Sequence, residues 1–223
     1  MDSENRHAVI FDMDGTLIDN MMVHHRAWQR KLATLGLDWD LDKIHQEVHG
    51  VNIEILERIF GDRFTPEERQ KISDEKEAEY RKIFEPELEL IAGAGDLLHD
   101  LKKSNIPLGM GTAAPPPNVD FVMNNLDLWR YFDVVLHSED VKIGKPDPEI
   151  YLKVSGELDV SPERCIVFED TPTGAEAARR AGCKIIVVTT THSADEFNDN
   201  DHVVKFITDY TEVTPSEVLG YLD

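Results

Sequence analysis

The segment from Val9 to Leu17 reads VIFDMDGTL and constrains this chain most. Three apolar residues lead directly to Asp12 and Asp14, which are separated by one residue and followed by a glycine. The pattern predicts a short buried strand that presents two carboxylates at the carboxyl edge of a sheet. Because carboxylates this close repel each other, we expect a metal ion or a shared proton beside them. An Asp-Gly turn would account for Asp14 but not for Asp12.

Three later segments place polar groups at, or just beyond, the ends of predicted strands. The run PLGMGT ends in Thr112, and the run CIVFEDTP carries Glu169 and Asp170 after its apolar residues. Between these runs, Lys145 stands between a glycine and a proline. A strand threonine, a surface lysine and acids that cap a helix are the ordinary alternatives.

Short apolar runs alternate with helical patterns over most of the chain. This alternation predicts an α/β fold, a doubly wound, Rossmann-like parallel sheet with helices on both faces. Ligands of such sheets bind at the carboxyl ends of strands, where Asp12, Thr112 and Asp170 fall. The expected strands are 7–12, 106–112, 133–136, 165–169 and 184–189, and the expected helices are 93–103, 118–128, 147–158 and 173–181.

The segment 20–88 differs, because it has helical spacing, many charges and no convincing buried strand. We expect amphipathic helices around 27–32 and 53–60. A third helix should begin at Thr65-Pro66. The predicted organisation is therefore a core formed by 1–19 and 89–223, with 20–88 as an inserted helical domain.

Three further stretches carry simpler expectations. The run Pro115-Pro116-Pro117 is predicted to be a stiff local loop. The polar stretch from Thr190 to Asn200 is predicted to be a surface loop, and Thr214 to Tyr221 a short terminal helix.

Composition limits the classes of partner. The 223 residues carry a formal charge of -21, which argues against binding nucleic acid or an anionic membrane surface. Cys165 and Cys183 each begin an apolar run and are expected to be buried and reduced. The first residues lack the apolar core of a signal peptide, and no apolar stretch is long enough to span a membrane. We therefore expect a cytoplasmic protein.

The ordered motifs DMD, Thr112, GKP and Glu169-Asp170 resemble those of the haloacid dehalogenase (HAD) superfamily, over nearly the whole chain. Within it, the chain is most similar to the branch of β-phosphoglucomutases and sugar-phosphate phosphatases. The resemblance implies a Rossmann-like core with an inserted helical cap. It also implies Mg²⁺-dependent phosphoryl transfer through an aspartyl phosphate.

The resemblance gives the acidic residues distinct roles. Asp12 would be the nucleophile and a metal ligand. Asp14 would be the general acid and base, and its backbone carbonyl would also bind Mg²⁺. Dehalogenase members lack this second acid, so Asp14 favours phosphoryl transfer. Asp170 would be the third metal contact, with Glu169 as a second ligand or an orienter of bound water.

Uncharged and basic groups would bind the phosphoryl group. Lys145 and Mg²⁺ would cancel its charge, while the Thr112 hydroxyl and the Ala113 N–H would donate hydrogen bonds to it. In the inserted domain, His24 and Lys76 stand where the mutases carry a histidine and a lysine near the site. Gly50 begins a segment that resembles the family's specificity loop.

The chain departs from the mutases at two places. Ile53 stands where they usually have an arginine for the second phosphate, and Ala114 with three prolines replaces a Ser-Lys pair. Asn118 is then the nearest polar substitute. Because each lost charged hydrogen bond costs about 1.5–3 kcal/mol, these changes favour hydrolysis over a reaction that must hold a bisphosphate.

The predicted protein is a monomeric Mg²⁺-dependent phosphatase of a small phosphorylated metabolite such as a sugar phosphate. The first alternative is a β-phosphoglucomutase, and pyrophosphate hydrolysis is another. An inactive relative that only binds ligands is disfavoured, because no nucleophile, acid or metal ligand is missing. A dinucleotide-binding protein is disfavoured because no Gly-x-Gly-x-x-Gly follows the first strand.

Overall fold

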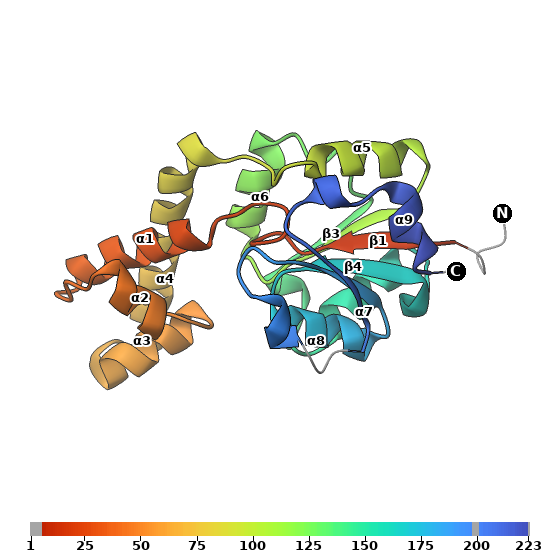
Figure 1. Ribbon diagram of the computed structural model, residues 1–223. Helices are drawn as coiled ribbons and strands as arrows, with labels where there is room; N and C mark the ends of the chain where they lie inside the picture. Colours follow the sequence, from red (N-terminus) through yellow and green to blue (C-terminus); the bar gives the residue numbers. More distant parts are fainter. Residues whose placement is uncertain (1–5, 198–200, 223) are drawn as a thin grey trace. The chain divides into compact units, whose positions relative to one another are not determined.

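The fold is a six-stranded parallel sheet with helices on both faces, as the alternating pattern predicts (Figure 1). The computed structural model describes residues 6–197 and 201–222. The strands lie in the order β3-β2-β1-β4-β5-β6, and every neighbouring pair is parallel. Their bounds are β1 Ala8–Phe11, β2 Leu108–Gly111, β3 Val134–Leu136, β4 Cys165–Glu169, β5 Lys184–Val188 and β6 Val203–Ile207.

The strands are apolar along their length because both faces of the sheet are covered. On one face, α7 (Glu149–Glu157) and α8 (Pro172–Ala181) pack against the strands, while α5 (Ala94–Lys103) and α9 (Pro215–Gly220) cover the other (Figure 1). Ile10, Val154 and Val167 belong to the core under α7 and α8. This packing makes the sheet a rigid support for the loops at its carboxyl edge.

The order of the strands places a crevice beside the end of β1. The chain runs outward from β1 to β2 and β3, and then returns to the other side of β1 as β4. Ligands of open α/β sheets bind where the winding direction reverses in this way. Asp12 follows β1 directly, and its N–H donates to the Phe168 carbonyl of β4 at 3.0 Å. The ends of β1 and β4 are therefore held together.

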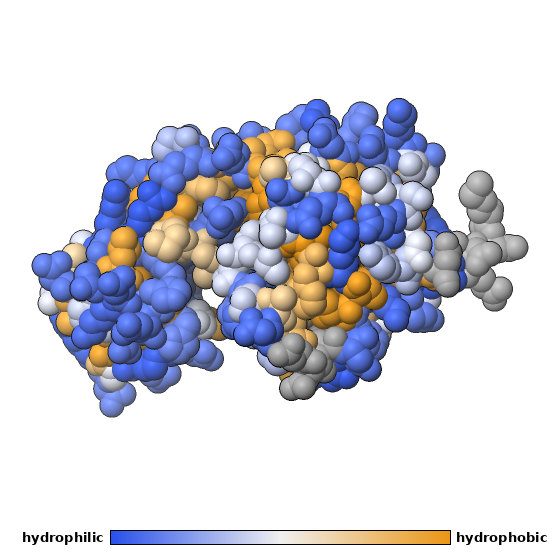
Figure 2. All heavy atoms as spheres, in the orientation of Figure 1, coloured by the Kyte–Doolittle hydropathy of each residue, from blue (hydrophilic) through white to orange (hydrophobic). Residues whose placement is uncertain are grey.

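The chain divides into two compact units, Met1–Asp19 with Glu89–Asp223, and Asn20–Leu88. The second unit is helical, with α1 (Met21–Thr34), α2 (Leu41–Glu47), α3 (Asn52–Phe60) and α4 (Pro66–Phe84). Its small core contains Trp28, Leu32 and Leu56. Hydrophilic residues make up most of its visible surface (Figure 2).

Thr65 begins α4 with the expected N-cap, because its hydroxyl accepts a hydrogen bond from Glu68 N and the Glu68 carboxylate accepts one from Thr65 N. The sequence patterns did not predict α2 or β6. The strand β6 lies at the edge of the sheet, and most of its residues are half-buried. A polar residue is tolerated at such an edge, so Lys205 interrupts the apolar run that would otherwise have indicated a strand.

The three prolines do not form the predicted loop. Pro115 is the N-cap of α6 (Pro116–Asn125), and Pro116 and Pro117 are its first two residues. Proline fits there because its fixed φ is helical and the N–H groups of a first turn have no partner within the helix. The stretch from Thr190 lies at the surface as expected, with half-buried or exposed residues up to Glu196, although Phe197 is buried. Its last predicted residues, 198–200, lie outside the described residues.

The expectations for the two cysteines and for the terminal helix are confirmed. Cys165 and Cys183 are both buried and form no disulfide. Among residues 6–197 and 201–222, no helix has the length and apolar character needed to cross a membrane. The terminal helix predicted from Thr214 is observed as α9.

Candidate active site

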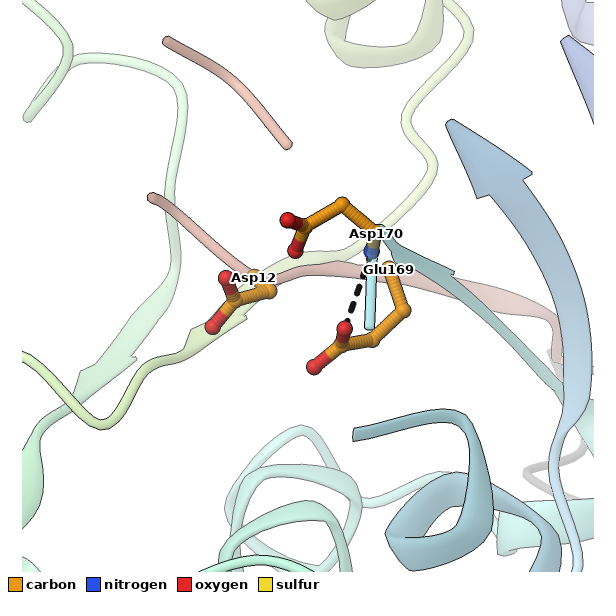
Figure 3. A group of neighbouring side chains, drawn as sticks. All are labelled: Asp12, Glu169 and Asp170. Atoms are coloured by element: carbon orange, nitrogen blue, oxygen red, sulfur yellow. Dashed lines mark hydrogen bonds between the residues drawn. The ribbon is translucent and has the colours of Figure 1, made fainter. Parts of the chain in front are cut away.

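The ends of β1 and β4 bring three acids together. Asp12, Glu169 and Asp170 are all buried, and one carboxylate oxygen from each lies within 4.8 Å of the others. Figure 3 shows Asp12 next to the paired acids, with the Glu169 carboxylate folded back to the N–H of Asp170. The parallel register aligns Phe11 with Phe168, so the residues that follow both strands meet at one edge. The sequence predicts these three acids as metal ligands together with the backbone carbonyl of Asp14, which is not part of this side-chain group.

Lys145 supplies a cation at the same place. Its Nζ lies 2.7 Å from Asp12 Oδ1 and 2.6 Å from Glu169 Oε1, and its side chain is 9% exposed. Burial alone would lower the pKa of Lys145, but the charges of Asp12 and Glu169 outweigh it and hold that pKa above its ordinary value. Lys145 is therefore a charged, fixed ammonium.

One ammonium does not balance the acids. Burial raises the pKa of Asp12 to about 7; Lys145 opposes this rise, and the charges of Glu169 and Asp14 add to it. Burial, and then the charges of Glu169 and Asp12, also hold the pKa of Asp170 well above its usual range. Ionising all three acids beside one ammonium is therefore unfavourable, and a bound cation would stabilise their ionised forms.

The donor set fits a hard divalent cation. Asp170 Oδ1 accepts a hydrogen bond from Thr16 Oγ1 at 3.2 Å. Within the described part of the chain, Asp170 Oδ2 is buried and forms no well-directed hydrogen bond, although the Thr191 hydroxyl lies near enough to lower the pKa of Asp170. A buried carboxylate oxygen without a well-directed donor is costly unless an ion occupies the space beside it. Carboxylate oxygens are ligands that Mg²⁺ prefers, so Asp12 and Asp170 are suitable to hold it.

Glu169 differs from the other two acids because donors surround both of its oxygens. Oε1 accepts from Lys145 and from the Tyr151 hydroxyl at 2.9 Å. Oε2 accepts from Asp170 N, Thr171 N and Thr171 Oγ1 at 2.9–3.1 Å. These donors fix the Glu169 carboxylate in one orientation.

The loop after β2 carries the predicted phosphoryl contacts. Thr112 is buried, its N–H donates to the Leu136 carbonyl at 3.1 Å, and its Oγ1 accepts from Ala114 N at 3.1 Å. Ala113 is exposed. Asn118 is buried in the first turn of α6, and its N–H donates to the Pro115 carbonyl at 2.9 Å. Thr112 and Ala113 thus lie at the same edge of the sheet as Asp12, while Asn118 begins the following helix.

His24 and Lys76 contact each other in the helical unit. Lys76 Nζ lies 2.7 Å from His24 Nδ1 and 2.9 Å from Glu77 Oε1. Because an ammonium has only protons to offer, His24 accepts this hydrogen bond as a neutral ring. Burial, followed by the charge of Lys76, lowers the pKa of His24 to about 3. Gly50 has a φ of +91° two residues before α3 begins, a conformation that favours glycine.

The sequence patterns did not single out two residues that organise the Lys145 loop. Glu149 Oε2 accepts from the N–H groups of Lys142 and Ile143 at 2.9 and 3.1 Å. Tyr151 is fully buried, and its ring centroid lies 4.9 Å from Lys145 Nζ. Both follow Pro148 in the first turn of α7. An acid and an aromatic residue are ordinary there, so their residue types alone do not indicate a role at the active site.

Comparison with known proteins identifies the family of this chain. A sequence model of the haloacid dehalogenase-like hydrolases matches residues 7–182. The chain is 35% identical to a phosphorylated carbohydrates phosphatase of Thermotoga maritima over 80% of this chain and 83% of that protein. It is 32% identical to a β-phosphoglucomutase of Bacillus subtilis, over 78% of this chain and 80% of that one.

Solved structures agree with the fold. The crystal structure of a family IA, variant 3 HAD hydrolase from Entamoeba histolytica superposes with a TM-score of 0.88 and 30% identity. The match covers 97% of this chain and 99% of that one. The chain therefore belongs to the haloacid dehalogenase-like hydrolases, as an enzyme of the phosphatase or phosphomutase type.

Proposed function

We propose that this enzyme hydrolyses the phosphate monoester of a small metabolite such as a sugar phosphate, through an aspartyl phosphate on Asp12. The observation that carries the proposal is the position of Asp12, with Lys145 Nζ 2.7 Å from its Oδ1 and Asp170 beside it. A carboxylate needs no activating base to attack phosphorus. It does need nearby positive charge, because the group that it attacks is itself anionic.

The reaction has two displacements. Asp12 attacks the phosphorus, the bond to the sugar oxygen breaks, and Asp14 gives that oxygen a proton. Asp14 then takes a proton from a water molecule, whose oxygen attacks the phosphorus and releases inorganic phosphate and free Asp12. Lys145, the Thr112 hydroxyl and the Ala113 N–H hold the phosphoryl oxygens during both steps.

Mg²⁺ is the proposed cofactor, held by Asp12, Asp170 and the backbone carbonyl of Asp14. When bound, it supplies a positive charge that stabilises the negative charge on the phosphoryl oxygens. The buried Asp170 Oδ2, which forms no well-directed hydrogen bond in the described part of the chain, supports this assignment.

Hydrolysis is favoured over mutase chemistry by the start of α6. Its N-cap and first two residues are prolines, which have no N–H, and the first available N–H, that of Asn118, donates to Pro115 O. This helix start therefore offers no backbone donor to a second phosphate. The contact between His24 and Lys76 and the similarity to a β-phosphoglucomutase keep the mutase as the second candidate.

The first experiment measures phosphate release from a panel of sugar monophosphates and p-nitrophenyl phosphate, with Mg²⁺ or with a chelator. We expect release only with the metal, and none from Asp12→Asn, which loses the nucleophile at nearly constant size. Asp19→Asn is the matched control, because Asp19 is an exposed acid of the same segment. Phosphate release by Asp12→Asn at the wild-type rate would exclude the mechanism.

Phosphorus NMR then separates the two candidates. Wild-type enzyme is mixed with β-glucose 1-phosphate, Mg²⁺ and a trace of glucose 1,6-bisphosphate. A growing signal of glucose 6-phosphate would identify a mutase, whereas free phosphate without that isomer supports hydrolysis.

A further inference from the structure

Tyr151 touches both partners of the buried ion pair at the active site. Its hydroxyl donates to Glu169 Oε1 at 2.9 Å, and its ring centroid lies 4.9 Å from Lys145 Nζ. Lys145 Nζ donates to the same oxygen at 2.6 Å and to Asp12 Oδ1 at 2.7 Å. One glutamate oxygen therefore accepts from two side chains, and only one of them, Lys145, also reaches Asp12.

Glu169 is built into this position from all sides. Its other oxygen accepts from Asp170 N, Thr171 N and Thr171 Oγ1. A β-carbon at Gly174 would lie 1.7 Å from Glu169 Oε1, so the absence of a side chain there makes room for the carboxylate. Since each carboxylate oxygen has about two lone pairs, the donors already present occupy them. Glu169 therefore fixes the positions of the side chains that donate to it, which are Lys145 and Tyr151.

A core role for Tyr151 alone would not require its hydroxyl. The residue is 0% exposed, and a phenylalanine would fill nearly the same volume. A buried hydroxyl is costly unless it is hydrogen-bonded, and this one bonds the acceptor that also fixes Lys145. The ring adds a face with which an ammonium interacts favourably.

We propose that Tyr151 is a positioning residue that, through Glu169 and through its ring, holds the Lys145 ammonium against Asp12. The inference rests on the proposed function, in which Lys145 accompanies the phosphoryl group. Without the hydroxyl, Glu169 Oε1 loses one of its two donors and attracts the Lys145 ammonium more strongly, which draws the ammonium away from Asp12. Catalysis then loses a correctly placed charge, while Asp170 and its surroundings are unchanged.

The test compares Tyr151→Phe with wild type, using p-nitrophenyl phosphate and the best substrate of the panel. We expect kcat to fall about 10–100-fold, the range typical when a partner that orients a site residue is lost. The affinity for Mg²⁺, measured by calorimetry, should stay within twofold of wild type. Tyr221→Phe is the matched control, because its hydroxyl also donates to a glutamate, Glu217 Oε1 at 3.3 Å. This control should retain wild-type kcat.

Two results would overturn the proposal. A kcat of Tyr151→Phe equal to that of wild type would show that the hydroxyl does not position Lys145. A parallel loss of kcat and Mg²⁺ affinity would assign Glu169 and Tyr151 to the metal instead. In both cases wild type still turns over, so the proposed function survives; inactive wild type, or an active Asp12→Asn, would contradict the function itself.

A second measurement needs no turnover. The urea midpoint is measured for Tyr151→Phe alone, for Lys145→Met alone and for the double variant. Because both groups bond Glu169 Oε1, the shift caused by Tyr151→Phe should be larger when Lys145 is absent and the carboxylate has lost its other donor. Equal shifts in both backgrounds would mean that Tyr151 and Lys145 are not coupled.

Discussion

Gly15 and Asp170 occupy complementary positions at the acidic centre. A β-carbon on Gly15 would lie 2.0 Å from Asp170 Oδ2 and 2.8 Å from Thr191 Oγ1. Gly15 also has a φ of +74°, a conformation that residues with side chains rarely adopt. The glycine after the two aspartates therefore serves the turn and the placement of Asp170, and these two requirements can be separated by experiment.

Gly15→Ala should abolish phosphate release and weaken Mg²⁺ binding, because the new methyl group forces the Asp170 carboxylate out of place. Gly36→Ala is the control for backbone strain, since Gly36 has a φ of +92° and open space around its α-carbon. This control should lose about 1–2 kcal/mol of unfolding free energy and keep its activity. Calorimetric Mg²⁺ titration and urea unfolding measure both effects. Normal Mg²⁺ affinity in Gly15→Ala would contradict the steric argument.

Asp170→Asn should bind Mg²⁺ at least about tenfold more weakly, a loss of about 1.4 kcal/mol or more. In the presence of a chelator, the same variant should unfold at a higher temperature than wild type. The reason is that the raised pKa of Asp170 means that folding disfavours its ionised form at neutral pH, a cost that asparagine removes. Thermal unfolding with and without Mg²⁺ measures both the weaker stabilisation by the metal and the higher unfolding temperature in its absence. A chelated variant less stable than wild type would show that the Asp170 charge is compensated without the metal.

Gly174→Ala should disturb the site although Gly174 lies in a helix. Its β-carbon would lie 1.7 Å from Glu169 Oε1 and 2.0 Å from Glu169 Cδ, so the carboxylate must leave its donors. Gly156→Ala is the matched control in α7, with nothing within 4 Å of the new methyl group. The control should gain up to about 1 kcal/mol from helix propensity. Gly174→Ala should instead lose stability and kcat, as urea unfolding and phosphate release would show. Equal gains in both variants would contradict this packing.

The stability of the protein should depend on pH through His24. Its folded pKa of about 3 lies below the ordinary value of 6.5, so the unfolded chain binds the proton more readily. The contribution of His24 to the free energy of unfolding is then fully present above pH 6.5 and is lost as the pH falls from 6.5 towards 3. Between pH 7.5 and 5 we expect a loss of about 2 kcal/mol from this group.

Urea unfolding of wild type, His24→Gln and His99→Gln at both pH values tests this expectation. His99 is an exposed histidine of α5 and is the control. His24→Gln should be less sensitive to the pH change than wild type, whereas His99→Gln should match wild type. An unchanged pH dependence in His24→Gln would show that another group is responsible.

Much of the site follows from the sequence because parallel strands share one carboxyl edge. The runs that end in Asp12, Thr112 and Glu169-Asp170 are apolar, so each is a buried strand, and their last residues must meet. Local sequence patterns did not predict a strand whose residues are only partly buried. They also did not distinguish prolines in a loop from prolines that begin a helix. The edge strand β6 and the start of α6 at Pro116 are the examples.

The sequence by itself determined the parallel sheet and which acids gather at its edge. The reason is that apolar strands, and their alternation with helices along the chain, can be recognised from short stretches of sequence. Only the tertiary structure decided how the carboxylates differ. Both oxygens of Glu169 accept hydrogen bonds, from Lys145, Tyr151 and the turn that follows, whereas the buried Asp170 Oδ2 forms no well-directed hydrogen bond although the Thr191 hydroxyl is near. The physical reason is that hydrogen-bond saturation depends on atoms from distant segments meeting in space. No local pattern of residue types encodes those meetings.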